Sequence, residues 1–306
     1  MTNHKGEVIA THTITANEIP QTLTVIDCVA CGWKHLDPLV PTETLKRFYG
    51  PSDAFYGEAS GHWFATQTAH HALGLWDAYY RFKAELLGCA GMVPGWAANI
   101  ENSMLDWGAG AGYFVEFWNK NMGWAVGIDP SEKARNSGGN FVIPAPHDRM
   151  FDDDIPAMHH CALTLEHLSD PVQFLRDTQE YNWGKGSRLL ITVPNDFNPI
   201  HKRLMKRGRK PWWVAKDHMN YFDPAGLRAC VEAAGLRVVW EGATAPHELL
   251  LLLGYNYVGD DAKGLKQHMV RLGIEKKIGW RIYYFYQWLY KRFGIGRELI
   301  FLVEAE

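Results

Sequence analysis

Short apolar runs alternate with longer amphipathic stretches through the middle of the chain, which is the pattern of strands joined by crossover helices. The first run begins at Met104 and leads into a glycine-rich turn, and the second ends at Asp129. We predict seven strands, at Met104–Trp107, Val126–Asp129, Val142–Ile143, Met158–Leu165, Ser187–Val193, Leu236–Glu241 and Glu298–Val303. The alternation therefore predicts an α/β fold with helices on both faces of a sheet.

Three stretches have helical periodicity. The best marked is Phe222–Gly235, where Asp223 stands at the N-cap, Pro224 at the first helical position and Gly235 just past the end. Upstream, Thr42–Tyr49 and His62–Leu87 also predict helices.

Changes in this pattern divide the chain into four parts. Residues 1–45 carry short strands and turns and form a small N-terminal module, and residues 46–99 form a helical cap. Residues 246–296 form a helical insertion before the last strand. The α/β core consists of residues 100–245 together with 297–306.

The turn after the first strand has the composition of a nucleotide-binding loop. Gly108, Gly110 and Gly112 lack a Cβ, so the backbone can approach a ligand closely. Asp129 follows at an offset that suits a ribose hydroxyl. The third glycine arrives one residue early for a dinucleotide fingerprint, and Asp106 would repel a pyrophosphate but attract a cation. The turn therefore favours S-adenosylmethionine, a sulfonium without phosphate, over NAD.

Composition excludes several classes of function. The chain has 306 residues, of which 47% are hydrophobic and 21% charged, as in a globular protein. A net charge of -3 gives no support to a nucleic-acid partner. No apolar window is long enough for a transmembrane helix, and five cysteines without a secretory signal predict the cytoplasm.

Cys28 and Cys31 form a Cys-x-x-Cys-Gly knuckle, which is half of a zinc ribbon. A structural zinc ion needs four ligands, and no second cysteine pair lies nearby. His4, His12 and His35 are candidate completions, but their spacing matches no standard pattern. We favour a degenerate knuckle with two reduced thiols, and no metal is predicted.

Four motifs in order resemble the class I S-adenosylmethionine-dependent methyltransferases. They are Leu105–Gly112, Gly127–Pro130, Leu165–Pro171 and His218–Pro224. The resemblance covers about residues 100–245 and the last ten residues. It implies a Rossmann-like sheet of seven strands that is mostly parallel, with the last strand antiparallel to its neighbours.

The resemblance also implies the cofactor-binding residues. The expected set is Asp106, Gly108, Gly110, Gly112, Asp129, Asp148 and Glu166. Asp129 is expected to accept hydrogen bonds from the ribose, and Glu166 to lie close to the methionine moiety. Asp148 is a candidate contact for the adenine.

A base is useful when the acceptor must lose a proton, and histidine suits that role at neutral pH. We expect His218 to be the base, with His167 second and Tyr221 beside them on the acceptor side. A related quinone-methylating branch binds a divalent metal through Glu-x-x-Glu-His. Here Leu163 occupies the leading position, so no metal is predicted at this site either.

The N-terminal knuckle followed by Arg47–Gly50 is similar to bacterial members that act in sugar and surface-glycan biosynthesis. That similarity implies a small-molecule acceptor, such as a sugar, a glycan intermediate or a related metabolite. The basic run from Lys202 to Lys210 suits an acidic acceptor, and equally a solvated surface.

Three alternatives remain open. A nicotinamide-dependent oxidoreductase would use the same glycine-rich turn, and a non-catalytic protein would bind S-adenosylmethionine without transferring its methyl group. The basic, aromatic segment 278–293 suits peripheral membrane contact and a lipid or quinone acceptor. We favour packing of that segment against its own domain.

Overall fold

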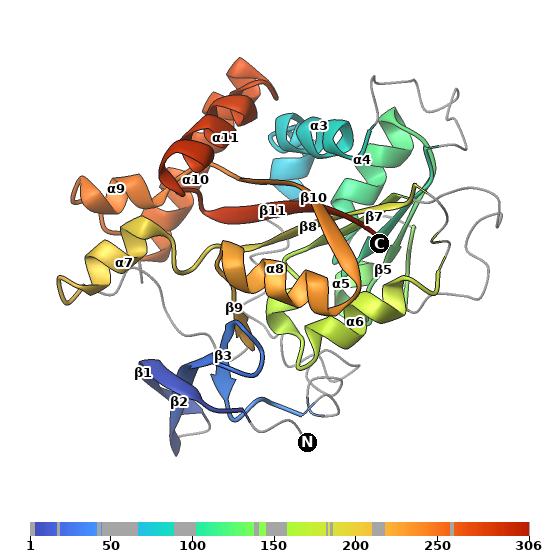
Figure 1. Ribbon diagram of the computed structural model, residues 1–306. Coiled ribbons are helices and arrows are strands. Elements are labelled where there is room, and N and C mark those ends of the chain that lie inside the picture. The colour runs from blue at the N-terminus through green and yellow to red at the C-terminus, as the bar shows by residue number, and fades with distance from the viewer. Residues whose placement is uncertain are drawn as a thin grey trace.

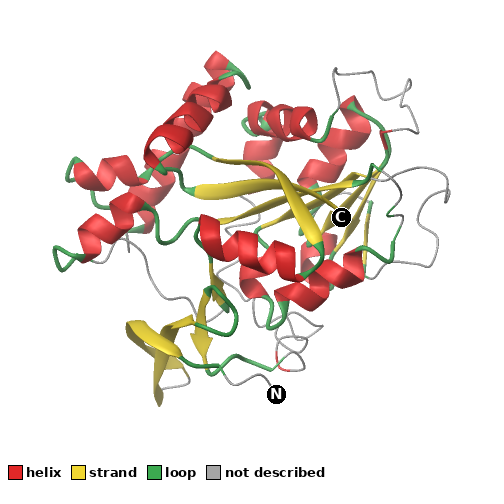
Figure 2. Cartoon of the chain, viewed as in Figure 1, coloured by secondary structure: helices red, strands yellow, loops and turns green. Residues whose placement is uncertain are grey.

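The computed structural model describes most of the chain, and the fold is given for the described residues alone. They are residues 4–16, 19–41, 44, 67–88, 102–137, 141–144, 158–181, 183, 186–209, 218–257 and 260–305. Figure 2 shows a central sheet between helices and a smaller sheet nearer the N-terminus. Asp148 and most of the predicted helix 42–49 lie outside the described residues.

The central sheet has seven strands. They are β4 (Met104–Trp107), β5 (Ala125–Ile128), β6 (Val142–Ile143), β7 (Met158–Ala162), β8 (Arg188–Pro194), β10 (Leu236–Ala243) and β11 (Glu298–Ala305). Their order is β10-β11-β8-β7-β4-β5-β6. β11 runs antiparallel to both β10 and β8, whereas the pairs from β8 to β6 are parallel. The predicted Rossmann-like sheet with an antiparallel last strand is therefore confirmed.

Helices cover both faces of this sheet (Figure 1). They include α3 (Asp77–Leu86), α4 (Tyr113–Asn121), α5 (Glu132–Asn136), α6 (Pro171–Thr178), α7 (Pro199–Met205), α8 (Pro224–Ala233), α9 (Glu248–Leu252), α10 (Asp261–Ile278) and α11 (Ile282–Phe293). α6 and α8 share one core cluster with Leu189 and Ile191 of β8, and α3, α4 and α11 share another with Leu190. Because side chains alternate along a strand, β8 serves both layers.

Two predicted elements are longer than the structure has them, and each is broken at a residue with a positive φ angle. The predicted helix over His62–Leu87 is interrupted among its described residues, where Gly74 has a φ of 60° and α3 begins afresh at Asp77. The predicted strand over Met158–Leu165 ends at Ala162, because Leu163 has a φ of 54°. A non-glycine residue rarely adopts that conformation, so the chain turns sharply there.

The second sheet joins the N-terminal module to the core. Its strands are β1 (Gly6–Ala16), β2 (Ile19–Cys28), β3 (Lys34–Asp37) and β9 (Asn220–Tyr221), in the order β1-β2-β3-β9. β9 belongs to the sequence motif that precedes α8, far from the others in sequence (Figure 1). The module therefore completes its sheet with a strand from the α/β core.

The predicted insertion before the last strand consists of α9, α10 and α11. On α11, Tyr283 and Tyr286 are buried in the core, as predicted for a segment that packs on its own domain. Phe285, Trp288 and Phe293 are each at least 50% exposed on the same helix. Among the helices that the structure describes, none combines the length and the apolar character needed to span a bilayer.

The caps of α8 are those predicted from sequence. Asp223 is the N-cap and accepts a hydrogen bond from the Gly226 N–H at 3.0 Å, and Gly235 has a φ of 79° just past the end. Asp223 also pairs with Lys34 at 3.1 Å, across to the small sheet. Burial raises the pKa of Asp223, but the hydrogen bond from Gly226 and the Lys34 charge outweigh it and hold that pKa below its usual value.

Asp223→Ala removes both the cap and the Lys34 pair, so we expect the free energy of unfolding at pH 7 to fall by about 2 kcal/mol. Because the folded pKa is depressed, this stabilisation is present above pH 3.8 and is lost as the pH falls through the folded value. Urea unfolding at pH 7 measures the difference.

The matched control is Asp260→Ala. Asp260 caps α10 through the Lys263 N–H in the same way, and it also pairs with the Lys263 side chain at 2.8 Å, where both side chains are more accessible to solvent than Asp223 and Lys34. A loss of stability no greater than in this control would mean that the Asp223–Lys34 contact contributes nothing.

Candidate functional site

The carboxyl ends of β4, β5 and β7 meet at one edge of the central sheet. In register, Trp107 pairs with Ile128 on one side and with Cys161 on the other. The Gly108 N–H donates to the Ile128 carbonyl at 2.8 Å, so the turn after β4 lies against the end of β5. This is the edge at which open α/β sheets bind ligands.

The turn after β4 has a backbone that only glycine adopts easily. Gly108, Gly110 and Gly112 have φ angles of 74°, 56° and 75°. At Gly108 a Cβ would also lie 2.1 Å from the Thr164 hydroxyl oxygen. The predicted glycines are therefore required by conformation, and at Gly108 also by close packing.

The Asp129 carboxylate is fixed against this turn. One of its oxygens accepts a hydrogen bond from the Gly110 N–H and the other from the Ser131 N–H, both at 2.8 Å. Burial raises the pKa of Asp129, and the two backbone hydrogen bonds oppose that rise. Since each carboxylate oxygen has a second lone pair, Asp129 can still accept from a ligand hydroxyl.

Asp106 is part of a buried chain of polar groups that the sequence did not reveal. Lys83 of α3 donates from Nζ to His160 Nε2 at 2.9 Å, and His160 Nδ1 contacts Asp106 Oδ1 at 2.6 Å. All three residues are less than 5% exposed. The structure thus connects Asp106, through His160, to the Lys83 ammonium group beside the position expected for the ligand.

Burial is the largest influence on the pKa values of Lys83 and His160 in this row of polar groups. It lowers the pKa of Lys83 to about 8, against the pull of Asp106. It also lowers the pKa of His160, and the Lys83 charge acts in the same direction. A neutral His160 accepts from Lys83 and donates to Asp106, so the chain is fully hydrogen-bonded when only its two ends are charged.

The predicted catalytic residues lie together after β7. Leu163 turns the chain into a short 3-10 helix, Leu165–His167. The Met219 N–H donates to the Glu166 carbonyl at 2.6 Å, which brings the segment before β9 onto this helix. The rings of His167 and His218 face each other edge-on, with 4.8 Å between their centroids.

Glu166 and Tyr221 complete this group. Glu166 Oε1 lies 4.0 Å from His167 Nε2, and the Tyr221 ring is 6.3 Å from that of His218. One donor atom from each of Glu166, His167 and His218 lies within 4.8 Å of the others. One carboxylate and two imidazoles suit proton transfer, and they are also a donor set that divalent metals accept.

The sequence predictions thus fall into two groups at one region of the fold. Asp106 lies in β4, and the glycines and Asp129 follow β4 and β5. Glu166 and His167 follow β7, His218 precedes β9, and Tyr221 lies in β9. Lys83 and His160 were missed. No local signal marks them, because Lys83 lies in a helix of the cap and His160 in the middle of a strand.

The comparisons with known proteins show the family to which the chain belongs. The family model described as a methyltransferase domain matches residues 82–241, more than half of the chain. The chain belongs to this methyltransferase family, and its cofactor is S-adenosylmethionine. No curated protein matches the chain.

Solved structures of low sequence identity are also similar. A putative methyltransferase of Haloferax volcanii, solved in complex with the Trm112 activator, is 14% identical with a TM-score of 0.45, over 80% of this chain and 95% of that one. An S-adenosylmethionine-dependent methyltransferase from Archaeoglobus fulgidus is 18% identical with a TM-score of 0.42, over 67% and 86%.

Asp129→Ala removes a charged acceptor from the cofactor edge. We expect S-adenosylhomocysteine to bind about 10- to 150-fold more weakly, as for the loss of a hydrogen bond to a charged group. Isothermal titration measures the affinity, and the thermal unfolding midpoint confirms that the variant is folded.

Glu132→Ala is the control, since Glu132 is an exposed acid in the first turn of the neighbouring α5. If Asp129→Ala is folded and binds S-adenosylhomocysteine as tightly as Glu132→Ala does, Asp129 has no role in cofactor binding.

Proposed function

We propose that this enzyme transfers the methyl group of S-adenosylmethionine to a small-molecule acceptor, and that His218 takes the acceptor's proton. The observation that carries the proposal is the meeting of His167 and His218 beside the edge that holds the glycine-rich turn. This geometry supports the proposal that the two candidate bases act beside the cofactor. Hydride transfer to a nicotinamide can also use a base, so it is the methyltransferase family match that favours methyl transfer over that alternative.

The reaction is an in-line displacement. The acceptor atom bonds to the methyl carbon while the carbon–sulfur bond breaks, and sulfur leaves with the electron pair as a neutral thioether. The acceptor's proton passes to His218 as the new bond forms. The protein's main tasks are alignment of the reacting atoms and exclusion of water.

The cofactor roles follow from the same edge. Asp129 is proposed to accept from the ribose, and the turn over Gly108–Gly112 to contact the aminoacyl end. Glu166 would lie near the methionine moiety. Asp106, already paired with His160, would act on the sulfonium through its charge rather than through direct contact.

The acceptor is proposed to be a sugar, a glycan intermediate or a related metabolite with acidic groups. α7 follows the end of β8 and exposes Lys202 and Arg203. Lys202 Nζ lies 3.8 Å from the carboxylate of Asp223, which is two residues after Tyr221, so α7 contacts the segment that carries the predicted acceptor residues. A phosphate-bearing acceptor, such as a nucleotide-linked sugar, would complement this charge.

His218→Ala is expected to lower kcat for methyl transfer by about 10²- to 10⁴-fold, the range that general base catalysis contributes. His167→Ala is expected to have a smaller effect. S-adenosylhomocysteine affinity should stay unchanged in both variants, because neither ring is proposed to hold the cofactor. Transfer of a labelled methyl group to nucleotide-linked sugars measures kcat.

His268→Ala is the matched control. His268 lies on α10, and burial lowers its pKa to about 3, so its ring is neutral at the pH of the assay. Full activity of His218→Ala and of His167→Ala would overturn the proposed base.

A peripheral membrane contact through residues 278–293 is a second proposal, supported by the exposed side of α11. Trp288 and Phe293 are 55% and 50% exposed, and Lys291 and Arg292 lie in the last turn of the same helix. Exposed aromatic rings beside cations are the usual components of an interfacial helix.

Vesicles with anionic headgroups should carry the protein upward in a flotation gradient at low salt, and less so at high salt. Trp288→Ser should weaken that binding, whereas Leu253→Ser, at a site 81% exposed on the neighbouring α9 end, should not. Failure to float at low salt would remove the membrane proposal.

A further inference from the structure

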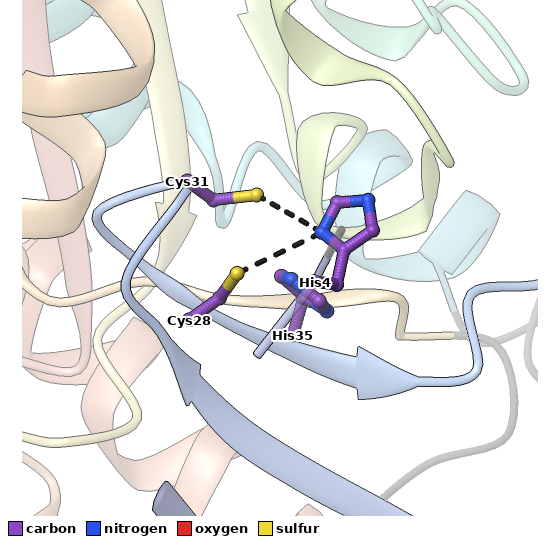
Figure 3. Close-up of side chains that lie close together, drawn as sticks. All are labelled: His4, Cys28, Cys31 and His35. Carbon is purple, nitrogen blue, oxygen red and sulfur yellow. Dashed lines mark hydrogen bonds between the residues drawn. The ribbon is translucent and has the colours of Figure 1, made fainter. Parts of the chain in front are cut away.

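Four side chains from three separate segments meet in the small N-terminal sheet (Figure 3). Cys28 ends β2, Cys31 lies in the turn that follows, and His35 stands in β3. His4 comes from the segment before β1, which the Val29 N–H anchors by donating to the Lys5 carbonyl at 3.0 Å. Every pair of donor atoms in this cluster is within 4.8 Å.

The separations of these donors are those of a tetrahedral metal site. His4 Nδ1 lies 3.7 Å from Cys28 Sγ and 3.4 Å from Cys31 Sγ. With zinc–sulfur bonds of about 2.3 Å and zinc–nitrogen bonds of about 2.05 Å, a tetrahedral angle places sulfur and nitrogen about 3.6 Å apart. The two contacts lie on either side of that distance.

His35 supplies an independent sign of a missing partner. Its ring is 1% exposed, and Nδ1 donates to the Leu36 carbonyl at 2.7 Å. That bond fixes the tautomer, because a carbonyl only accepts, and leaves a lone pair on Nε2. Nε2 is buried and has no hydrogen-bond partner among the residues that the structure describes. A metal-ligating histidine is held in this way, with its other nitrogen donating to a backbone carbonyl.

The turn between the cysteines has the backbone of a metal knuckle. The Gly32 N–H donates to the Cys28 carbonyl at 2.9 Å, and Gly32 has a φ of 81°. This conformation favours glycine and curls the chain so that both sulfurs face the same side. Figure 3 shows both thiols directed at the His4 ring.

We propose that His4, Cys28, Cys31 and His35 form a structural zinc site. Two thiolates and two imidazoles in a tetrahedron are a donor set that selects zinc, and four protein ligands leave no open position for catalysis. The sequence predicts no metal here, because the ligand spacings along the chain match no standard pattern. The two histidines come instead from the segment before β1 and from β3.

The site lies where the small sheet meets the catalytic segment. His35 pairs with Asn220 of β9, and the Leu36 N–H donates to the Met219 carbonyl at 2.8 Å. His218 directly precedes this pairing. A metal that holds β3 in place therefore also helps to position His218, although the zinc site itself does not depend on the proposed methyl transfer.

The direct test is the metal content of the full-length protein, purified from zinc-containing medium without chelators. We expect about one zinc ion per chain by mass spectrometry. Exchange for cobalt should give the intense visible bands and the thiolate charge-transfer bands of a tetrahedral S₂N₂ site. Cys28→Ser and His35→Ala should lose the metal, and His4→Ala, at the less buried end of the cluster, should bind it more weakly in a chelator competition.

Cys230→Ala is the matched control, because Cys230 is a buried free thiol outside the cluster and should leave the metal content unchanged. His12→Ala tests the other histidine of the module and should also retain the metal. Unmodified protein that holds no stoichiometric zinc and gives no tetrahedral cobalt spectrum would overturn the proposal, whatever the variants do. Loss of metal in His12→Ala but not in His4→Ala would overturn the ligand set.

Discussion

The hydrogen bonds of one buried side chain, Asn220, join the three parts of the molecule on which the site depends. Its Oδ1 accepts from the Trp33 indole at 2.9 Å, and its Nδ2 donates to the carbonyls of Leu165 and Leu168 at 3.0 and 2.7 Å. Its backbone pairs with His35 of β3. A buried amide that lost any of these partners would be costly, so the three segments are held in one arrangement.

This arrangement explains why the candidate catalytic groups meet. His167 belongs to the turn that Asn220 holds, and His218 lies two residues before Asn220. The N-terminal sheet thus supports the proposed acceptor side, and the glycine-rich turn and Asp129 form the proposed cofactor side.

Local patterns in the sequence predicted most of the core. Alternation of apolar runs located the seven strands, and the Asp-Pro start and glycine end located α8, because these signals depend on neighbouring residues alone. The strand end at Leu163 was missed, since a positive φ at leucine has no sequence signature. It reflects the fit of the following helix against β9.

Contacts between distant residues account for what the sequence did not give. Lys83, His160 and Asp106 are far apart in the sequence. The packing of α3 on β4 and β7 brings them into one hydrogen-bonded row. The same holds for His4 and His35, which meet the two cysteines from the segment before β1 and from β3. Residue spacing describes neither case, because the register of a sheet decides which side chains become neighbours.

A crystal structure with S-adenosylhomocysteine bound tests the central claim most directly, because it locates both sides of the site at once. The account predicts the ribose against Asp129, the amino acid end over the glycine-rich turn, and the sulfur directed toward the space beside His167 and His218. A ligand bound away from the ends of β4 and β5, or a sulfur that faces away from both histidines, would contradict it.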